Sequence, residues 1–303
     1  MKVLVCDSIS SRAVERMRKA GLDVDVRDKI TPEELLVAIP EYDAMVVRSR
    51  TKVRKPVLDA ATNLKVIVRG GVGVDNIDVD YAQAQGVKVL NTPGASTHAV
   101  AELAIAYIFA LARPIVQATA SLRNGLWEKS KFEGIEVAGK VIGVIGMGRI
   151  GTAVAQRAAA LGMLVLGYDS QTVGPAPYMH MVELDELYAR SDFISLHIPL
   201  TESSKHMINA ATFARMKKGV RIVDCARGGV LDETALYDAI VSGQVAGAAL
   251  DVFETEPLND RRLFELPQVI GSPHIGASTY EATARIGDEV ADLLIGASQE
   301  ARE

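Results

Sequence analysis

Three polar residues in the second half of the chain follow apolar runs that predict β-strands. Arg227, Glu256 and His274 come just after such runs, among them residues 220–226 and 245–253. In open α/β sheets the carboxyl ends of parallel strands share one edge, where ligands bind. We therefore expect these three side chains to gather at that edge.

An arginine, a carboxylate and a histidine are the groups that reversible hydride transfer at an alcohol carbon requires. The forked guanidinium of Arg227 can bind a substrate carboxylate and polarise the adjacent carbonyl. The imidazole of His274 can take the proton of a hydroxyl and return it. The carboxylate of Glu256 can fix the imidazole tautomer and favour its charged form.

Each of these residues also has an ordinary explanation when it is taken alone. Arg227 could form a surface ion pair, Glu256 could be a solvated loop acid, and His274, which lies between Pro273 and an apolar segment, could be a hydrogen-bonded core histidine. A second motif, which precedes these residues in the chain, makes the functional interpretation stronger.

That motif is a glycine turn, G-x-G-x-x-G, formed by Gly146, Gly148 and Gly151. It follows a predicted strand and opens a small-residue helix, and the next strand ends in Asp169. In a dinucleotide-binding unit the three glycines allow a tight turn, close approach of a diphosphate and close helix packing. The helix N-terminus holds the diphosphate.

Asp169 predicts which dinucleotide is bound. A carboxylate at this strand end can accept both ribose hydroxyls and repels a 2′-phosphate. Ser170 and Gln171 follow it rather than an arginine. We therefore expect NAD rather than NADP. The alternative interpretation is a purely structural glycine turn in an α/β domain.

Other candidate motifs support a functional interpretation less well. A Walker A-like stretch, Gly134-x4-Gly139-Lys140, has Val141 where Ser or Thr is needed, and it opens a strand instead of following one. No metal is expected, because the remaining histidines lack paired ligand spacing; these are His98, His180, His197 and His206. Cys225 is expected to be a packing residue and Trp127 an interface or packing anchor.

The elements that must position these residues alternate along the chain. Strand, helix and strand at these lengths predict crossover units and parallel sheets. A break at Asn91-Thr92-Pro93-Gly94 suggests a domain boundary, and a helix at 280–295 is expected to return to the first domain. The predicted strands are 2–7, 44–49, 65–70, 87–92, 140–146, 164–169, 192–199, 220–226, 245–253 and 269–276.

Composition fits a two-domain globular protein. The chain has 303 residues, a net charge of −5 and only two cysteines. These values argue against nucleic-acid binding, a disulfide framework and a zinc cluster. The longest uncharged apolar run, residues 103–112, is shorter than the roughly 20 residues that span a membrane. We expect a soluble protein of a reducing, cytoplasmic compartment, with no nucleic-acid or membrane partner.

Several segments together resemble the D-2-hydroxyacid dehydrogenase family. They are VIVRGGVGVDNID (66–78), NTPGASTHAVAELAIA (91–106), LWEKSKFEGIEVAGKVIGVIGMGRIG (126–151), DCARGGVLDETAL (224–236), GAALDVFETEP (247–257) and SPHIGAST (272–279). The resemblance spans nearly the whole chain. It implies a doubly wound Rossmann NAD domain, residues 96–276, inserted in a smaller flavodoxin-like substrate domain, residues 1–95 and 277–303. It also implies a homodimer formed through the NAD domains, or a homotetramer.

The resemblance also assigns roles to residues. It implies that Arg227, Glu256 and His274 are catalytic. Cofactor positions are Gly146, Gly148, Arg149, Ile150, Gly151, Asp169, Cys225, Ala226, Arg227 and Asp251, and substrate positions are Arg48, Gly71, Val72, Gly73 and Lys129. Three residues depart from the family pattern: Val72 and Ile198 stand where threonine is frequent, and Asp224 replaces a common asparagine.

Within the family, the branch most similar to this chain oxidises 3-phospho-D-glycerate to 3-phosphohydroxypyruvate with NAD, the first step of L-serine biosynthesis. The alternative within the family is a dehydrogenase for another small-molecule substrate, of the glyoxylate/hydroxypyruvate reductase or D-lactate type. A dinucleotide-sensing corepressor is the alternative from another class. Because no residues follow the terminal helix, we also expect no regulatory domain and no cooperative inhibition by L-serine.

Overall fold

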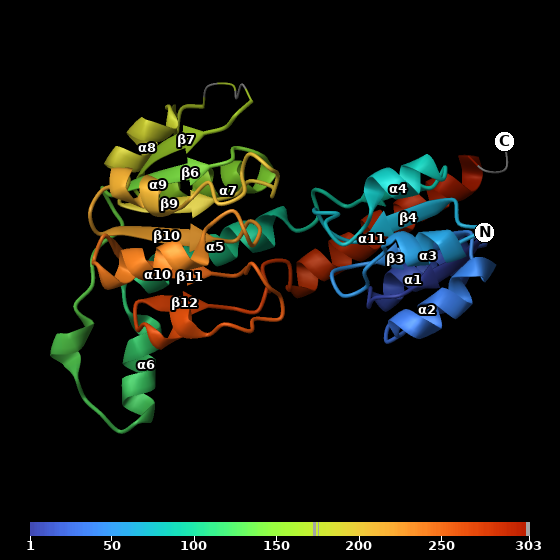
Figure 1. Ribbon diagram of the computed structural model, residues 1–303, viewed down its shortest axis with the longest axis horizontal. Coiled ribbons are helices and arrows are strands. Elements are labelled where there is room, and N and C mark those ends of the chain that lie inside the picture. The colour runs from blue at the N-terminus through green and yellow to red at the C-terminus, as the bar shows by residue number, and fades with distance from the viewer. Residues whose placement is uncertain (172–173, 175, 301–303) are drawn as a thin grey trace. The chain divides into compact units, whose positions relative to one another are not determined.

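The computed structural model describes residues 1–171, 174 and 176–300 and divides the chain into two compact units. Unit 1 comprises Met1–Ser96 and Ala277–Glu303, and unit 2 comprises Thr97–Gly276. Both are α/β units (Figure 1). Ser96 falls in unit 1 rather than after the boundary expected from the sequence, and residues 301–303 of the expected C-terminal range lie outside the described residues.

Unit 1 contains a five-stranded parallel sheet in the order β2-β1-β3-β4-β5. This is the flavodoxin-like order, with its switch point between β1 and β3. All four residues of β3 are buried, as expected of a parallel strand covered on both faces. The strands are β1 (Lys2–Val5), β2 (Asp23–Val26), β3 (Ala44–Val47), β4 (Val66–Arg69) and β5 (Lys88–Asn91).

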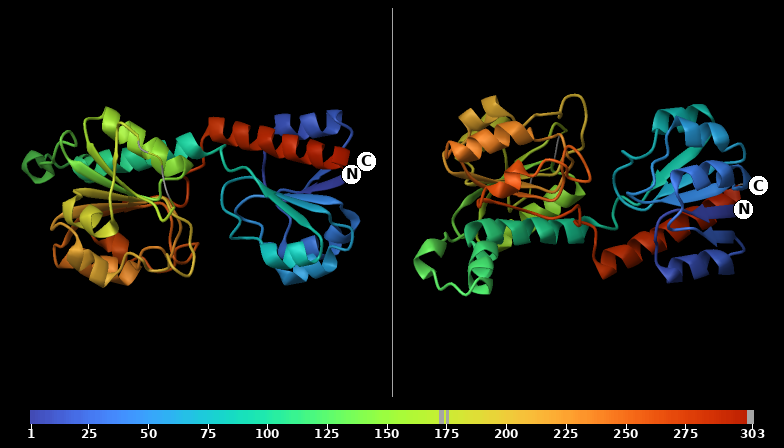
Figure 2. Two further views of the ribbon diagram at one scale, coloured as in Figure 1. Left: turned by 90° about the horizontal axis from the view of Figure 1, so that it is seen from above. Right: turned by 60° about the horizontal axis from the view of Figure 1, so that its bottom comes forward.

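Helices cover both faces of this sheet, and the C-terminal helix is one of them (Figure 2). Val290 of α11 packs in the same buried cluster as Val14 of α1, and Arg16 pairs with Asp288 and Asp292. The end of the chain therefore completes unit 1. Its helices are α1 (Ser11–Lys19), α2 (Pro32–Ala38), η1 (Ile39–Glu41), α3 (Lys55–Ala60), α4 (Val79–Ala84) and α11 (Tyr280–Glu300).

The N-terminus of α2 has the local structure that its sequence predicts. The Thr31 hydroxyl accepts a hydrogen bond from Glu34 N, and the Glu34 carboxylate accepts one from Thr31 N. Pro32 occupies the first turn, where no backbone donor is needed. Thr31 is therefore the N-cap of α2.

Unit 2 contains a seven-stranded parallel sheet in the order β12-β11-β10-β9-β6-β7-β8. The order reverses between β6 and β9, as in a Rossmann fold. The strands are β6 (Val141–Ile145), β7 (Leu164–Tyr168), β8 (His180–Met181), β9 (Phe193–Leu196), β10 (Val220–Asp224), β11 (Val245–Leu250) and β12 (Val269–Gly271). The two doubly wound sheets confirm the predicted fold class.

Two helical layers sandwich the unit 2 sheet (Figure 2, left). On one face α5 (Thr97–Ala112) packs against α7 (Arg149–Ala160) through small residues such as Ala104 and Ala155. The other layer consists of α8 (Leu184–Arg190), α9 (Ala210–Arg215) and α10 (Glu233–Val241). The remaining helices are α6 (Ile115–Arg123), η2 (Lys129–Phe132) and η3 (Arg262–Glu265).

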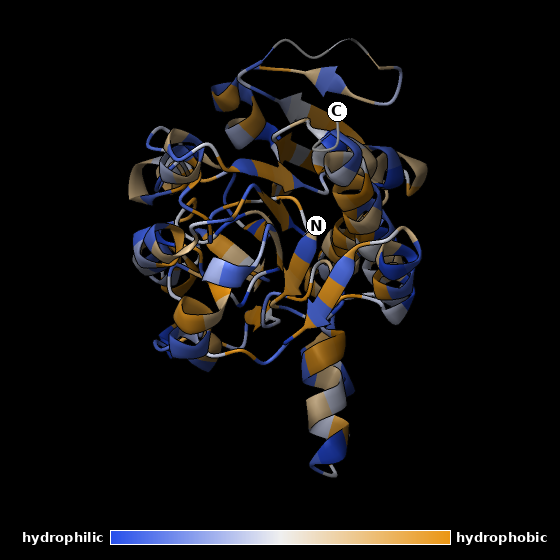
Figure 3. Ribbon diagram, turned by 90° about the vertical axis from the view of Figure 1, so that its right-hand side faces the viewer, coloured by the Kyte–Doolittle hydropathy of each residue, from blue (hydrophilic) through white to orange (hydrophobic). Residues whose placement is uncertain are grey.

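Helix α6 and η2 form an excursion from unit 2, here named the α6 arm and defined as residues 115–132. Figure 3 shows apolar residues on α6, the helix at the bottom of that view. Ile115, Val116 and Leu122 are exposed, and the Trp127 side chain is 85% exposed. Packing of Trp127 within the described part of the chain is therefore excluded, and its interpretation as an interface residue remains a prediction.

The helices were compared with the length and apolarity that a membrane span requires. In the described residues no single helix is long and apolar enough to cross a membrane. Helices α5 and α6, with a bend of 67° between them, meet the length and composition criteria only as a pair.

The sequence missed two short edge strands. β2 carries aspartates at alternate positions, so it lacks the continuous apolar run of the inner strands, and β8 has only two residues. The predicted strands extended past the observed strand ends, most of all at 192–199, 245–253 and 269–276. β9 ends at Leu196, β11 at Leu250 and β12 at Gly271, because the chain turns away from the sheet before the residues that follow.

Candidate active site

His274 and Glu256 form a hydrogen-bonded pair beyond the ends of β12 and β11. His274 Nδ1 lies 2.8 Å from Glu256 Oε2, and Glu256 Oε1 accepts a hydrogen bond from Phe253 N at 3.2 Å. Burial raises the pKa of the Glu256 carboxyl. The hydrogen bond and charge of His274, the Phe253 N–H and Arg227 together outweigh burial and lower that pKa below its ordinary value. Glu256 is therefore a carboxylate at neutral pH, and it accepts a hydrogen bond from the Nδ1 side of the imidazole.

Arg227 lies in the turn after β10, close enough for its charge to contribute to the low pKa of Glu256. Its Nη1 donates to the carbonyl of Ala226 at 2.6 Å. The next residue, Gly228, packs so tightly that a Cβ there would lie 1.8 Å from the carbonyl oxygen of Phe253. The arginine turn and the loop that carries Glu256 are thus in direct contact.

The glycine turn joins β6 to α7 as its sequence predicts. Gly146 has φ of +94°, and a Cβ there would lie 2.5 Å from His197 O. A Cβ on Gly151 would lie 1.8 Å from Gly146 O, which explains the need for glycine where the helix meets the turn. Gly148 differs, since a Cβ there would meet nothing within 4 Å. The space over Gly148, at the N-terminus of α7, is therefore open.

Asp169, at the end of β7, lies beside this turn. Its Oδ2 accepts a hydrogen bond from Met147 N at 2.7 Å and its Oδ1 accepts one from Gln171 N at 2.9 Å. Both oxygens keep a second lone pair for ribose hydroxyls. Arg149, the first residue of α7, is exposed, and Ile150 is half-buried.

Three other predicted cofactor residues, Cys225, Ala226 and Asp251, are buried. Cys225 lies under the sheet edge, and burial raises the pKa of its thiol well above the usual value. Asp251 is only 1% exposed, and its carboxylate accepts hydrogen bonds from Ser272 and from the backbone N–H groups of Ile275 and Gly276. Neither Ser272 nor this arrangement was anticipated from the sequence.

The predicted substrate residue Arg48 follows β3 in unit 1 and is half-buried. Its backbone N–H donates to Asp7 at 2.5 Å. The Asp7 carboxylate also pairs with Arg50 at 3.1 Å and accepts from the Thr51 hydroxyl at 2.8 Å. Arg50 is a second cation at this strand end that sequence reasoning missed. Its guanidinium donates to the carbonyls of Cys6, Asp28 and Ile30.

The Gly71-Val72-Gly73 segment follows β4, and its backbone carbonyls accept hydrogen bonds from the residues at the end of β5. Gly71 has φ of +145° and its Cβ position is filled by the Arg69 guanidinium. The Gly71 carbonyl accepts from Thr92 N at 3.1 Å, and the Val72 carbonyl accepts from Asn91 at 2.5 Å.

The remaining predicted residue, Lys129, is exposed on the α6 arm, away from the sheet edge of its own unit.

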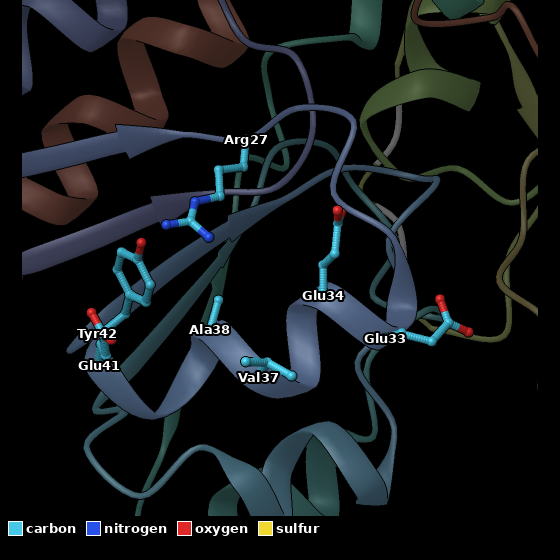
Figure 4. A pocket seen from close by; sticks show the side chains of 7 residues that line it. All are labelled: Arg27, Glu33, Glu34, Val37, Ala38, Glu41 and Tyr42. Atoms are coloured by element: carbon cyan, nitrogen blue, oxygen red, sulfur yellow. The ribbon is translucent and has the colours of Figure 1, made fainter.

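Two further features bear on ligands. Across the described ranges, no group of three or more His, Cys, Asp and Glu side chains is arranged to hold a metal ion. A pocket of about 440 Å³ lies beside α2 in unit 1 (Figure 4). It is lined by Arg27, Glu33, Glu34, Val37, Ala38, Glu41 and Tyr42, and contains none of the predicted site residues.

Comparison with known proteins identifies the family. The model of the D-isomer specific 2-hydroxyacid dehydrogenase NAD binding domain matches residues 105–276. A hydroxypyruvate reductase of Thermotoga maritima is 50% identical over 300 residues, covering 97% of each chain. The chain belongs to the D-isomer specific 2-hydroxyacid dehydrogenase family.

Other dehydrogenases of this family are also similar. The D-3-phosphoglycerate dehydrogenase of Archaeoglobus fulgidus is 48% identical over 299 residues, which cover 97% of this chain and 57% of that protein. The chain thus spans little more than half of that relative. The crystal structure of D-lactate dehydrogenase from Aquifex aeolicus, complexed with NAD and lactic acid, matches with a TM-score of 0.85 and 29% identity over 99% of this chain and 97% of that one.

The family match makes NAD the cofactor of unit 2, and the local structure fits it. Gly148 leaves open space at the N-terminus of α7, where the helix dipole favours a diphosphate. Asp169 lies at the end of the neighbouring strand, where a ribose is bound in Rossmann folds.

Proposed function

We propose that this dehydrogenase oxidises 3-phospho-D-glycerate to 3-phosphohydroxypyruvate with NAD, the first step of L-serine biosynthesis. The observation that carries the proposal is the imidazole–carboxylate pair of His274 and Glu256, 2.8 Å apart beyond the strand ends of an NAD-binding unit. Family membership supports the reaction class. The phosphorylated substrate is supported by similarity to D-3-phosphoglycerate dehydrogenases.

In the proposed mechanism His274 is the acid/base. Its Nδ1 is bonded to Glu256, so Nε2 is the nitrogen that takes the hydroxyl proton during oxidation and returns it during reduction. The Glu256 carboxylate stabilises the imidazolium that forms. Arg227 binds the substrate carboxylate and polarises the C2 oxygen as it becomes a carbonyl. NAD supplies the acceptor for the hydride that leaves C2.

The residues proposed to hold NAD follow from the glycine turn. The backbone of Gly148, Arg149 and Ile150 binds the diphosphate, and Asp169 binds the ribose hydroxyls. Cys225, Ala226 and Asp251 line the inner end of the same strand edge, so they would lie near the nicotinamide. Val72 and Ile198 lack the hydroxyl that threonine would offer.

A phosphate at the third carbon requires a cation other than Arg227, which is committed to the carboxylate. We propose Arg48 for this role, with the backbone of Gly71, Val72 and Gly73 as the neighbouring substrate contact. Burial lowers the pKa of the Arg48 guanidinium, and the charge of Asp7 opposes that effect. An arginine keeps its charge even so, which makes it a strong phosphate ligand. Lys129 is a weaker candidate.

The competing reaction is the reduction of hydroxypyruvate, after the relative that aligns over 97% of this chain and 97% of its own length. It runs the same proton and hydride transfers in the reverse direction, on a substrate that carries no phosphate. A dinucleotide-sensing corepressor would bind NAD without turning it over. NADH formation separates the sensor from either enzyme.

Substrate choice is tested by steady-state kinetics with 3-phospho-D-glycerate and D-glycerate. Arg48→Ala is expected to raise KM for 3-phospho-D-glycerate about ten- to a hundredfold, because a charge-assisted phosphate contact is lost. KM for D-glycerate should be unchanged. Lys52→Ala, an exposed cation four residues further on, is the matched control. An equal loss on both substrates, or a preference of the wild type for the unphosphorylated acids, would exclude the phosphate assignment.

We also propose a cytoplasmic homodimer or homotetramer that binds no nucleic acid and no membrane. The exposed apolar surface of the α6 arm supports an interface between copies of the chain.

A further inference from the structure

His274 has an unusual backbone that the proposed chemistry does not explain. Its φ is +54°, a left-handed conformation that non-glycine residues rarely adopt. Such conformations persist where the surrounding structure holds them in place. The side chain of His274 is 40% exposed, so contacts of the imidazole itself are few. The restraint must therefore come from the backbone on either side of it.

The residues on both sides of His274 are fixed by one buried carboxylate. Asp251 Oδ1 accepts from Ile275 N at 2.8 Å, and Oδ2 accepts from Gly276 N at 2.7 Å. Ser272, two residues before His274, donates its hydroxyl to the same Oδ1. The Asp251 side chain thus closes a loop that has His274 at its tip.

The hydrogen-bond network extends from Ser272 to Tyr107 of α5. The Tyr107 hydroxyl lies 2.5 Å from Ser272 Oγ. Because the Ser272 proton is given to Asp251, Tyr107 is the donor in this contact. Tyr107 is 7% exposed, and burial raises the pKa of its phenol to about 12; the hydrogen bond with Ser272 lowers it, whereas the charges of Asp251 and Cys225 raise it further. The phenol is therefore protonated and can donate at neutral pH.

Close packing leaves this loop little freedom. A Cβ on Gly276 would lie 2.9 Å from Asp251 Oδ2 and 3.3 Å from Val100 of α5. Ser272 N donates to Leu250 O, which joins the loop to the end of β11. The network therefore links α5, β11 and the loop after β12 within unit 2.

We infer that Tyr107, Ser272 and Asp251 are positioning residues that hold His274 in its left-handed backbone and thereby aim its Nδ1 at Glu256. Here these three residues are named the loop clamp. The inference rests on the proposed role of His274 as the acid/base, and it adds a function for two residues outside the proposed cofactor and substrate sites. It also gives Asp251 a structural role besides the proposed cofactor contact.

The test uses Tyr107 and Ser272, since changes at Asp251 would also affect the proposed cofactor contact. Tyr107→Phe should lower kcat about three- to tenfold and Ser272→Ala about ten- to thirtyfold, because each removes a buried hydrogen bond behind the acid/base. KM and the affinity for NADH, measured by fluorescence, should change less than about twofold. Ser272→Thr, which keeps a hydroxyl, should retain most of the activity.

Matched controls distinguish positioning from a general loss of packing. Tyr188→Phe removes a buried hydroxyl that makes no hydrogen bond to any described residue, and Ser191→Ala removes a buried hydroxyl bonded to Leu187 O within α8. Both controls should keep the wild-type kcat. The pH profile of kcat for Ser272→Ala should move toward that of Glu256→Gln, whereas a loss of folded protein would lower the profile without moving it.

A crystal structure of the Ser272→Ala protein provides a readout that does not depend on turnover. We expect His274 to leave the positive-φ region and its Nδ1 to separate from Glu256. Wild-type kcat in both Tyr107→Phe and Ser272→Ala, while His274→Ala is inactive, would overturn the clamp and leave the proposed function intact. Absence of turnover by the wild type would overturn the proposed function, and the conformation of His274 in the variant would still decide whether the clamp exists.

Discussion

At the scale of single residues, buried carboxyl groups at two neighbouring strand ends behave differently. Asp251 accepts two backbone N–H groups and a serine hydroxyl. Asp224, 2% exposed at the end of β10, accepts from Ala226 N at 2.9 Å. Burial, with smaller contributions from Glu233 and Asp251, raises the pKa of Asp224 to about 7, although the Ala226 N–H and Arg227 lower it. Ionisation of Asp224 therefore destabilises the folded state.

This difference predicts how stability changes with pH. The pKa of an aspartate in the unfolded chain is about 3.9. Between that value and about pH 7, Asp224 is therefore protonated more often in the folded state than in the unfolded state. Asp224 thus lowers stability progressively as pH rises through this window, and the loss is complete above it. Asp224→Asn keeps the acceptor for Ala226 N and removes the charge. It should stabilise the protein at about pH 8 by up to roughly 4 kcal/mol, and by almost nothing at about pH 4.

Urea unfolding at both pH values measures this difference. Asp192→Asn is the control with the opposite sign. Burial raises the pKa of Asp192, but the Lys217 hydrogen bond, the Val141 N–H and the lysine charges outweigh it and lower that pKa. Its loss should destabilise the protein at neutral pH. A stability gain of Asp224→Asn that is the same at both pH values would contradict the assigned cause.

At the scale of elements, the turn between β6 and α7 separates two uses of glycine. Gly151 is required by the protein itself, since a Cβ there would lie 1.8 Å from Gly146 O. At Gly148 the folded protein itself would accommodate a side chain, since the Cβ position is open. The two residues belong to one motif, but the backbone constrains Gly151, whereas we propose that the cofactor constrains Gly148.

Alanine substitutions distinguish these constraints. Gly148→Ala should fold with wild-type stability and bind NADH at least about tenfold more weakly, because a methyl group would fill the space of the diphosphate. Gly151→Ala should lose both stability and binding, because the helix must shift away from the turn. Thermal unfolding and NADH fluorescence report the two effects. Normal NADH affinity in Gly148→Ala would show that the open space is not the diphosphate site.

The sequence predicted those elements whose signal is local. The glycine turn was recognised because strand, turn, helix and Asp169 follow one another along the chain. The pairing of His274 with Glu256 was expected because both follow strands of a parallel sheet. The loop clamp was not predicted, since Tyr107 lies in an apolar helix 165 residues from Ser272 and only the fold brings them together. Arg50 was missed because Arg48 had already filled the role of the cation after β3.

At the scale of the whole molecule, each unit has its own sheet and its own core, and the α6 arm exposes apolar side chains of unit 2. Apolar side chains on this arm are exposed in the described chain, with Trp127 the largest of them. Exposed contiguous apolar residues on a folded unit indicate an interface. We therefore expect more than one copy of the chain to associate in solution.

Trp127→Glu should shift the protein toward the monomer in light scattering, because a charge replaces the aromatic side chain in the proposed interface, at a cost of about 2 kcal/mol or more. Val37→Glu, an equally exposed apolar residue of unit 1, is the control and should leave the assembly unchanged. A monomeric wild type, or an assembly unaffected by Trp127→Glu, would show that this arm is not the interface.

The central claim is that His274 carries the proton in an NAD-linked oxidation, and one measurement tests it most directly. NADH formation is followed with saturating 3-phospho-D-glycerate and NAD for the wild type and His274→Ala, with NADH affinity measured in both. We predict that His274→Ala lowers kcat by about 10²–10⁴ at unchanged NADH affinity. Turnover by His274→Ala close to that of the wild type, or no NADH formed by the wild type from any D-2-hydroxy acid, would contradict the account.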